Sequence, residues 1–126
     1  MAEEVKVKLI ESEEVRQRLA ELKKNSDDMA SYIKIDERRA NLAKLEDLQA
    51  QGDFWNNQNK AREVIAATNA ERAYTVPYDS LLKTIEDAQV MFELAEMEEG
   101  EAQQIAFKDT LSECDKADQY FSKLRM

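Results

Sequence analysis

Two groups of side chains in this 126-residue sequence have residue types that could do chemistry. Several glutamates cluster between Glu93 and Glu101, and clustered carboxylates can bind a divalent cation. Their spacing does not match a calcium-binding loop, and clustered glutamates usually face solvent, so we expect no metal site there. Cys114 is the only thiol. It falls in phase with the apolar residues of a helix, which predicts a small core residue rather than a nucleophile.

The sequence contains no histidine, and this absence removes most common kinds of active site. It excludes serine and cysteine nucleophiles that a histidine activates, zinc sites with histidine ligands and the Glu-x-x-His di-iron pattern of helical bundles. The single cysteine cannot form an internal disulfide, which agrees with a reducing compartment. We therefore expect a chain without enzymatic activity, catalytic residues, cofactor or bound metal.

The composition predicts an all-α fold for the elements that carry these side chains. Charged residues make up 36% of the chain, and only two glycines and one proline are present, so few positions favour turns. The length is typical of one domain, and we expect residues 1–126 to form a single helical domain. The expected architecture is an antiparallel bundle of three long helices and a shorter one, with turns near residues 32–36, 52–57 and 98–101.

The formal net charge of −9 limits the partners of the chain. A net acidic surface is repelled by phosphate, so little direct contact with nucleic acid is expected. No stretch approaches the ~20 apolar residues of a membrane-spanning helix, and residues 1–8 are charged where a signal peptide becomes hydrophobic. We expect a cytoplasmic protein without a membrane role.

Apolar residues at three- and four-residue spacing predict a first helix from Val5 to about Ser31. The polar cluster at residues 25–28 leaves an alternative, because Asn, Ser and Asp compete for backbone hydrogen bonds and favour helix ends. The helix either continues through the cluster or stops before it, and continuity is the alternative that we favour. The residues expected to face inward are Val5, Leu9, Val15, Leu19, Leu22, Met29 and Ile33.

A second helix is expected from about Glu37 to Gln51. Asp36 is expected to cap its first turn, with Ile35 placed to pack on the helix that it opens. Gly52 stands where a left-handed C-terminal cap would be wanted. The predicted buried face of this helix consists of Leu42, Leu45 and Leu48.

The strongest periodicity lies in a third helical pattern, which Asn56 or Asn57 can cap. Its second half shows the alternating spacing of a coiled-coil-like bundle helix. Pro77 falls within this pattern and deletes one backbone hydrogen bond. Either the helix kinks there or a new helix begins at Pro77, and the unbroken phase of the pattern favours a kink. The expected core positions are Ala61, Val64, Ile65 and Thr68, followed by Tyr74, Tyr78, Leu81, Ile85, Ala88, Phe92 and Ala95.

A final helix is expected after Gly100, which interrupts the acidic run that follows the third pattern. Three- and four-residue spacing again predicts an amphipathic helix. The residues expected to face inward are Ile105, Leu111, Cys114, Ala117, Phe121 and Leu124.

Phe54 and Trp55 are the candidate site residues, because they place two aromatic rings in the polar joint between the second and third patterns. Aromatic residues dominate interface hot spots, so the pair could anchor a partner. A Phe-Trp pair at a helix joint more often folds back over the end of a bundle, and this is the interpretation that we expect. It predicts that Trp55→Ala mainly lowers stability, since burying both rings at ~25 cal/mol per Å² would contribute several kcal/mol.

Short motifs follow one another through nearly the whole chain. In order they are Tyr32-Ile33-Lys34-Ile35-Asp36, Asp53-Phe54-Trp55-Asn56, Lys60-Ala61-Arg62, Val76-Pro77-Tyr78, Glu93-Leu94-Ala95-Glu96 and Leu124-Arg125-Met126. In this order and at these spacings, they resemble the N-terminal helical domain of the bacterial peptide chain release factor 2 family, within the class I release factors. The tryptophan favours type 2 over type 1 factors, whose corresponding joint usually lacks it.

The resemblance implies a non-catalytic part in translation termination. Members of that family use a Gly-Gly-Gln loop for peptidyl-tRNA hydrolysis and a Ser-Pro-Phe loop to read stop codons. Neither motif occurs here, since Gly52 and Gly100 are far apart and the only proline follows Val76.

The family's first domain lies near the stalk base of the large ribosomal subunit. The implied partners are therefore the ribosome, through its proteins, and the GTPase release factor, with this chain expected to be the N-terminal domain of a longer factor. The alternative is a stand-alone helical adaptor or scaffold that recruits a protein partner.

Overall fold

The computed structural model describes residues 8–125, which fold almost entirely into helices. Along the chain the elements are α1 (Ser12–Ile33), α2 (Ile35–Gln49), the short 3-10 helix η1 (Phe54–Asn56), α3 (Gln58–Glu96) and α4 (Gly100–Leu124). Residues 8–125 contain no β-strand. The predicted all-α fold is confirmed.

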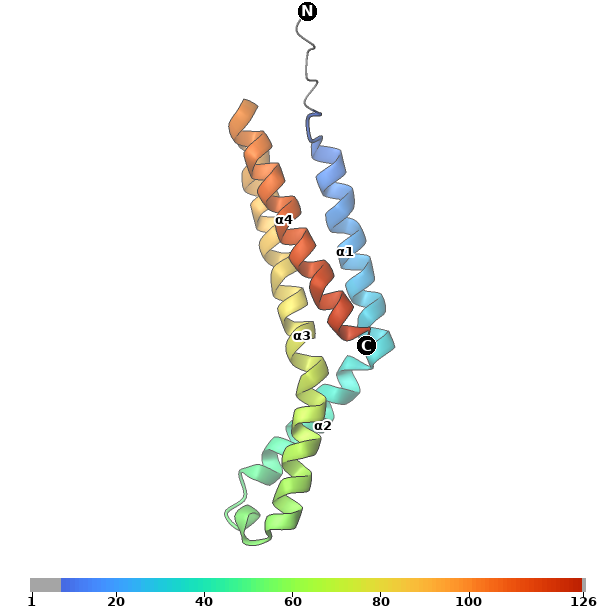
Figure 1. Cartoon of the computed structure of the whole chain (residues 1–126), viewed down its shortest axis with the longest axis vertical. Coiled ribbons are helices and arrows are strands. Elements are labelled where there is room, and N and C mark those ends of the chain that lie inside the picture. The colour runs from blue at the N-terminus through green and yellow to red at the C-terminus, as the bar shows by residue number, and fades with distance from the viewer. Residues whose placement is uncertain (1–7, 126) are drawn as a thin grey trace, which may run out of the picture.

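The helices form a three-helix body and a two-helix arm (Figure 1). In the body, α1 and α4 both run antiparallel to the second half of α3, and the contact between α3 and α4 is the most extensive. In the arm, α2 packs against the first half of α3, and η1 lies at the far end. Because α3 runs through both parts, it is the continuous rod that joins them.

The joint between α1 and α2 is a one-residue kink rather than the expected antiparallel turn. Lys34 alone separates the helices, and it adopts a left-handed conformation with φ 57° and ψ 54°. The two helices continue in the same general direction (Figure 1). The prediction that Asp36 caps α2 is wrong, since Lys34 takes the N-cap position and Asp36 lies within the first turn. The physical reason is burial: Ile33 and Ile35 both enter the core, so α2 must begin directly after the kink.

Arg38 connects the three helix segments that meet at this joint. Its Nε donates a hydrogen bond to the carbonyl of Ile33, the last residue of α1, at 2.7 Å. Its guanidinium lies over the ring of Tyr74 in α3, 3.7 Å from the ring centroid, and 3.6 Å from the carboxylate of Glu71. A cation over an aromatic face contributes roughly 0.5 to 2 kcal/mol. These contacts fix the direction in which the arm leaves the body.

Replacing Lys34 by glycine is expected to raise the free energy of unfolding by up to about 1 kcal/mol. The left-handed conformation costs an L-residue roughly 1 to 2 kcal/mol, which glycine avoids, although glycine gains entropy in the unfolded chain. Thermal denaturation followed by circular dichroism would measure the gain. Lys34→Ala keeps the Cβ atom and is expected to show no gain, so an equal rise in Tm for both variants would contradict this explanation.

The second helix ends earlier than the sequence predicts. α2 ends at Gln49, with Ala50 as its C-cap, rather than at Gln51. Gly52 is not a left-handed cap, because within residues 8–125 only Lys34 and Gly100 have positive φ angles.

The predicted buried face of α2 is only partly buried. Leu42 and Leu45 are half-buried, and Leu48 is exposed. The reason is that α2 packs mainly along one neighbour, α3, and contact with one helix covers a narrower strip than a bundle does. Ala61, Val64 and Thr68 of α3 are buried as predicted, and Ile65 is half-buried.

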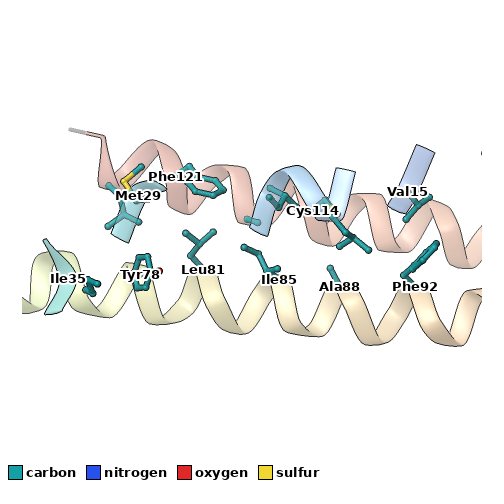
Figure 2. Packing of buried hydrophobic residues seen from close by; sticks show 14 of the residues in the cluster. Val15, Met29, Ile35, Tyr78, Leu81, Ile85, Ala88, Phe92, Cys114 and Phe121 are labelled. Atoms are coloured by element: carbon teal, nitrogen blue, oxygen red, sulfur yellow. The ribbon is translucent and has the colours of Figure 1, made fainter. Parts of the chain in front are cut away.

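The core of the body is one continuous apolar layer between α1, α3 and α4 (Figure 2). Leu81 and Ala88 of α3 have no exposed surface, and Phe92 stacks on Phe107 of α4 with ring centroids 6.1 Å apart. Such burial contributes about 25 cal/mol per Å² of apolar surface. The buried residues that the periodicity predicted correctly in this layer are Val15, Leu19, Leu22, Met29, Ile33, Tyr78, Leu81, Ile85, Ala88, Phe92, Ala95, Cys114, Ala117, Phe121 and Leu124.

The first helix continues through the polar cluster at residues 25–28, as favoured. Ser26 is buried there, and its hydroxyl donates to the carbonyl of Lys23 at 2.7 Å. Its own carbonyl accepts a hydrogen bond from the Tyr78 hydroxyl at 3.2 Å, so its polar atoms are satisfied inside the core. Of the two earliest predicted core residues, Val5 lies outside the described residues and Leu9 is exposed before the start of α1.

The third helix continues through Pro77 as one element of 39 residues. The alternative in which a new helix begins at Pro77 is therefore wrong. Pro77 lies near the middle of α3. The carbonyl that loses its partner belongs to Ala73, which is exposed, so water can solvate it.

The fourth helix differs from the prediction at its first inward position. Ile105 is 56% exposed, whereas Phe107 and Thr110 are buried in the core. Phe107, Thr110 and the predicted core residues from Cys114 onward follow one another at an alternating spacing of three and four residues. Ile105 falls outside this pattern and lies on the opposite side of the helix. Leu111 is only half-buried.

Candidate partner-binding surface

The Phe54-Trp55 joint lies at the tip of the arm, far from the body (Figure 1). Two backbone hydrogen bonds stabilise η1. The Phe54 N–H donates to the Gln51 carbonyl at 3.2 Å, and the Asn56 N–H donates to the Asp53 carbonyl at 3.1 Å. The side-chain oxygen of Asn57 then accepts a hydrogen bond from the Lys60 backbone at 3.1 Å and caps α3. Of the two predicted caps, Asn57 is the one that the structure uses.

The expected fold-back of both rings is wrong for Trp55. This residue is 64% exposed, and its ring meets the half-buried Phe54 edge-on, with centroids 4.7 Å apart. The physical reason is that the arm is only two helices wide, so its end offers too little apolar surface to cover two rings. The joint therefore leaves an indole ring at the tip rather than clamping the helices of a bundle.

A cavity of about 330 Å³ lies beside Phe54 at the same tip. Leu48 and Val64 contribute apolar surface to it, and Asp53 and Lys60 contribute one charge of each sign. Protein interfaces commonly combine exposed aromatic rings with a mixed polar rim. The arm tip is therefore the candidate contact surface of the chain.

Trp55→Ala is expected to lower the free energy of unfolding by less than about 1 kcal/mol, because an exposed side chain makes few contacts that folding creates. The expected loss of stability is smaller than the one predicted from the sequence, which assumed a buried ring. Urea denaturation followed by far-UV circular dichroism would measure the difference. Trp55 is the only tryptophan, so the fluorescence of the folded chain should resemble that of an exposed indole and be readily quenched by acrylamide. A loss of stability of several kcal/mol, or a shielded fluorophore, would show that the ring is buried.

The other two candidate groups do not combine into a reactive site. Cys114 is completely buried between the helices of the body, as predicted, and burial raises the pKa of its thiol above the ordinary value of 9.0. In the acidic run, Glu96 accepts a hydrogen bond from the Ser12 hydroxyl at 3.0 Å and lies 3.4 Å from the Arg16 guanidinium. Within residues 8–125, no three Cys, Asp or Glu side chains are arranged to hold a metal ion.

Stability is expected to fall as the pH rises above about 9. Burial is the main cause that raises the pKa of two groups. The pKa of the Cys114 thiol lies above its ordinary value of 9.0, and that of the Tyr78 hydroxyl lies above its ordinary value of 10.0. Between the ordinary and the raised pKa, the unfolded chain has released a proton that the folded chain still holds, so rising pH favours unfolding. Urea denaturation at about pH 8 and about pH 10 would measure the loss.

The double variant Cys114→Ala/Tyr78→Phe serves as the control for this pH dependence. It removes both groups whose pKa burial raises, so its stability should change less between the two pH values than that of the wild type. An unchanged pH dependence in the double variant would assign the alkaline loss to other groups.

The described residues thus define a class of protein: an elongated all-α protein with a three-helix body, a two-helix arm and an exposed aromatic tip. Within residues 8–125, none of the helices is long and apolar enough to cross a membrane. No family model matches the sequence, and no solved structure matches it.

The chain is similar in sequence to peptide chain release factor 2 from several bacteria. The factor of Exiguobacterium sp. is 32% identical over 89 residues, which cover 71% of this chain and 24% of the relative. The factor of Nocardia farcinica is 34% identical over 95 residues, which cover 75% of this chain and 26% of the relative. The factor of Staphylococcus haemolyticus is 26% identical over 112 residues, which cover 88% of this chain and 30% of the relative. The matched part of the chain therefore spans only 24% to 30% of the length of these relatives, and the resemblance predicted from its motifs is confirmed.

Proposed function

We propose that this chain serves translation termination as a non-catalytic helical unit that positions a release factor and contacts its partners. The observation that carries the proposal is the similarity to release factor 2, which extends over 71% to 88% of this chain in the relatives from Exiguobacterium and Staphylococcus haemolyticus. The chain contains neither a Gly-Gly-Gln nor a Ser-Pro-Phe sequence. Peptidyl-tRNA hydrolysis and codon reading would therefore depend on residues outside it.

The shape of α3 supports a positioning role. Its 39 residues correspond to a rod of about 58 Å at the usual rise per residue. The body packs on one half of this rod and the arm tip lies at its other end (Figure 1). Such a unit can hold two contact surfaces at a fixed separation.

The charge of the chain favours ribosomal proteins and the GTPase release factor over RNA as its direct partners. A net charge of −9 is repelled by the phosphate backbone, whereas ribosomal proteins offer basic and apolar surfaces. The proposed place of action is the cytoplasm, near the stalk base of the large ribosomal subunit. The proposed contact at the arm tip is made by Trp55, with Phe54 supporting its ring.

Ribosome co-sedimentation of the chain, with a salt titration, tests this proposal. The wild-type chain should sediment with ribosomes at low salt, and Trp55→Ala should weaken the association. Tyr32→Ala is the matched control, because Tyr32 is also a largely exposed aromatic residue but lies at the end of α1. Equal binding by the wild type and Trp55→Ala would remove the tip from the proposal.

A peptide-release assay tests the non-catalytic part. Ribosomes that hold a peptidyl-tRNA at a stop codon should show no release above background when the chain is added. Stop-codon-dependent release by the chain alone would contradict the proposal.

A stand-alone adaptor or scaffold is the second candidate function, and the exposed Trp55 beside a cavity is the observation that favours it. An adaptor would use the same tip to recruit a protein partner without a ribosome. A folded chain that fails to sediment with ribosomes even at low salt would favour this second function.

A further inference from the structure

A second apolar surface runs along the outer side of α3 in the body. Val90, Leu94 and Met97 are 49%, 59% and 80% exposed. Their spacing of four and three places them along one side of the helix, roughly opposite to the core residues Ala88 and Phe92. α1 and α4 pack on the core face of α3 and leave these three side chains exposed. We call this surface, together with Leu82, the α3 outer strip.

The α3 outer strip continues into a groove between α1 and α3. A cavity of about 390 Å³ lies there, with Leu82 and Val90 at its edge and the buried Ile85 in its wall. From Leu82 to Met97, the C-cap of α3, the strip follows 15 residue steps, or about 22 Å. Its length corresponds to about four turns of a helix.

Carboxylates surround this strip. Asp27 and Glu86 line the groove, Glu93 lies next to Leu94 in α3, and Glu98 follows Met97 just after α3 ends. Within residues 8–125, no ion pair involves any of these four side chains. Among residues 8–125, Lys23 is the only basic residue that lines the groove. The border of the strip therefore carries more negative than positive charge.

We infer that the α3 outer strip binds an amphipathic helix with basic flanks from a protein partner. The apolar residues of such a helix would cover Leu82, Val90 and Leu94, as helices commonly do in hydrophobic grooves. Its lysines and arginines would lie beside the carboxylates, with their aliphatic stems on the apolar surface. The charge argues against two other occupants: a second copy would bring a further net charge of −9, and a nucleic acid would bring phosphates. The inference does not rest on the proposed role in termination.

Fluorescence anisotropy with the full chain and a labelled synthetic helix tests this inference. The probe is a leucine-lysine peptide of about 16 residues, with leucines at helical spacing along one side. It should bind, and its binding should weaken with salt. Val90→Ser/Leu94→Ser should weaken binding at least about tenfold. Ile105→Ser is the matched control, because Ile105 is 56% exposed but lies on α4, and it should leave the Kd within about twofold of the wild type.

Two further experiments test the role of charge in binding and the integrity of the fold. Glu93→Gln/Glu98→Gln should weaken binding and reduce its salt dependence, while a leucine-glutamate peptide with the same pattern should not bind. All substituted side chains are on the surface, so circular dichroism should show the wild-type unfolding midpoint. Wild-type affinity in Val90→Ser/Leu94→Ser, an equal loss in Ile105→Ser, or equal binding of the acidic peptide would overturn the inference.

Discussion

Phe107→Ala is expected to lower the free energy of unfolding by about 3 to 5 kcal/mol, whereas Ile105→Ala should lower it by less than about 0.5 kcal/mol. Phe107 is 1% exposed and stacks on Phe92, so its removal leaves a cavity in the core of the body. Ile105 is two residues earlier on the same helix but faces solvent. Urea denaturation of the wild type and both variants, followed by far-UV circular dichroism, would measure the two losses.

This pair tests the rotational position of α4 in the bundle. The sequence alone favoured Ile105 as the inward residue, and a rotation of α4 toward that prediction would exchange the two effects. Phe107→Leu is a useful intermediate variant, because it keeps most of the apolar volume and should cost less than alanine does. A larger loss for Ile105→Ala than for Phe107→Ala would contradict the packing of α3 against α4.

Ala88→Asp is expected to lower the free energy of unfolding by at least about 4 kcal/mol, or to prevent folding. Ala88 has no exposed surface and lies in the layer between α1, α3 and α4 (Figure 2). An aspartate at this position would bury a carboxylate without a partner and force neighbouring side chains apart. Chemical denaturation near neutral pH would measure the loss.

Ala70→Asp is the matched control, because Ala70 lies on the exposed side of the same helix. It should cost about 0.5 kcal/mol, the usual difference in helix propensity. The loss in Ala88→Asp, relative to the wild type at each pH, should shrink in acid. Burial would raise the pKa of the new carboxyl group in the folded chain, so its protonated form is tolerated better. A similar small loss in both variants would show that α1 and α4 do not cover this side of α3.

The two proposed interaction surfaces lie on different parts of the molecule. The arm tip presents an exposed indole ring beside a small cavity, and the α3 outer strip presents an apolar face with acidic borders. The strip is on the half of α3 that belongs to the body, and the tip is at the opposite end of that helix (Figure 1). A unit that holds two such surfaces on one rod fits a role in positioning. The joint at Lys34 and Arg38 then sets the direction of the arm.

The sequence by itself determined the helices and most of the core of the body. Each helical segment carries its own spacing of apolar residues, and that spacing is a local property that does not depend on which neighbour covers the face. This is why the positions from Val15 to Ile33 in α1, and from Tyr78 to Ala95 in α3, were predicted correctly. The order of short motifs was sufficient to indicate the likeness to release factor 2.

Only the tertiary structure decided how many neighbours surround each segment. α3 is the main neighbour of α2 and of the tip of the arm, so Leu48 and Trp55 remain exposed although their residue types favour burial. The kink at Lys34 follows from the simultaneous burial of Ile33 and Ile35, which no local pattern specifies. Burial depends on the surfaces that distant parts of the chain bring together. The exposed aromatic tip and the α3 outer strip are therefore properties of the assembled fold.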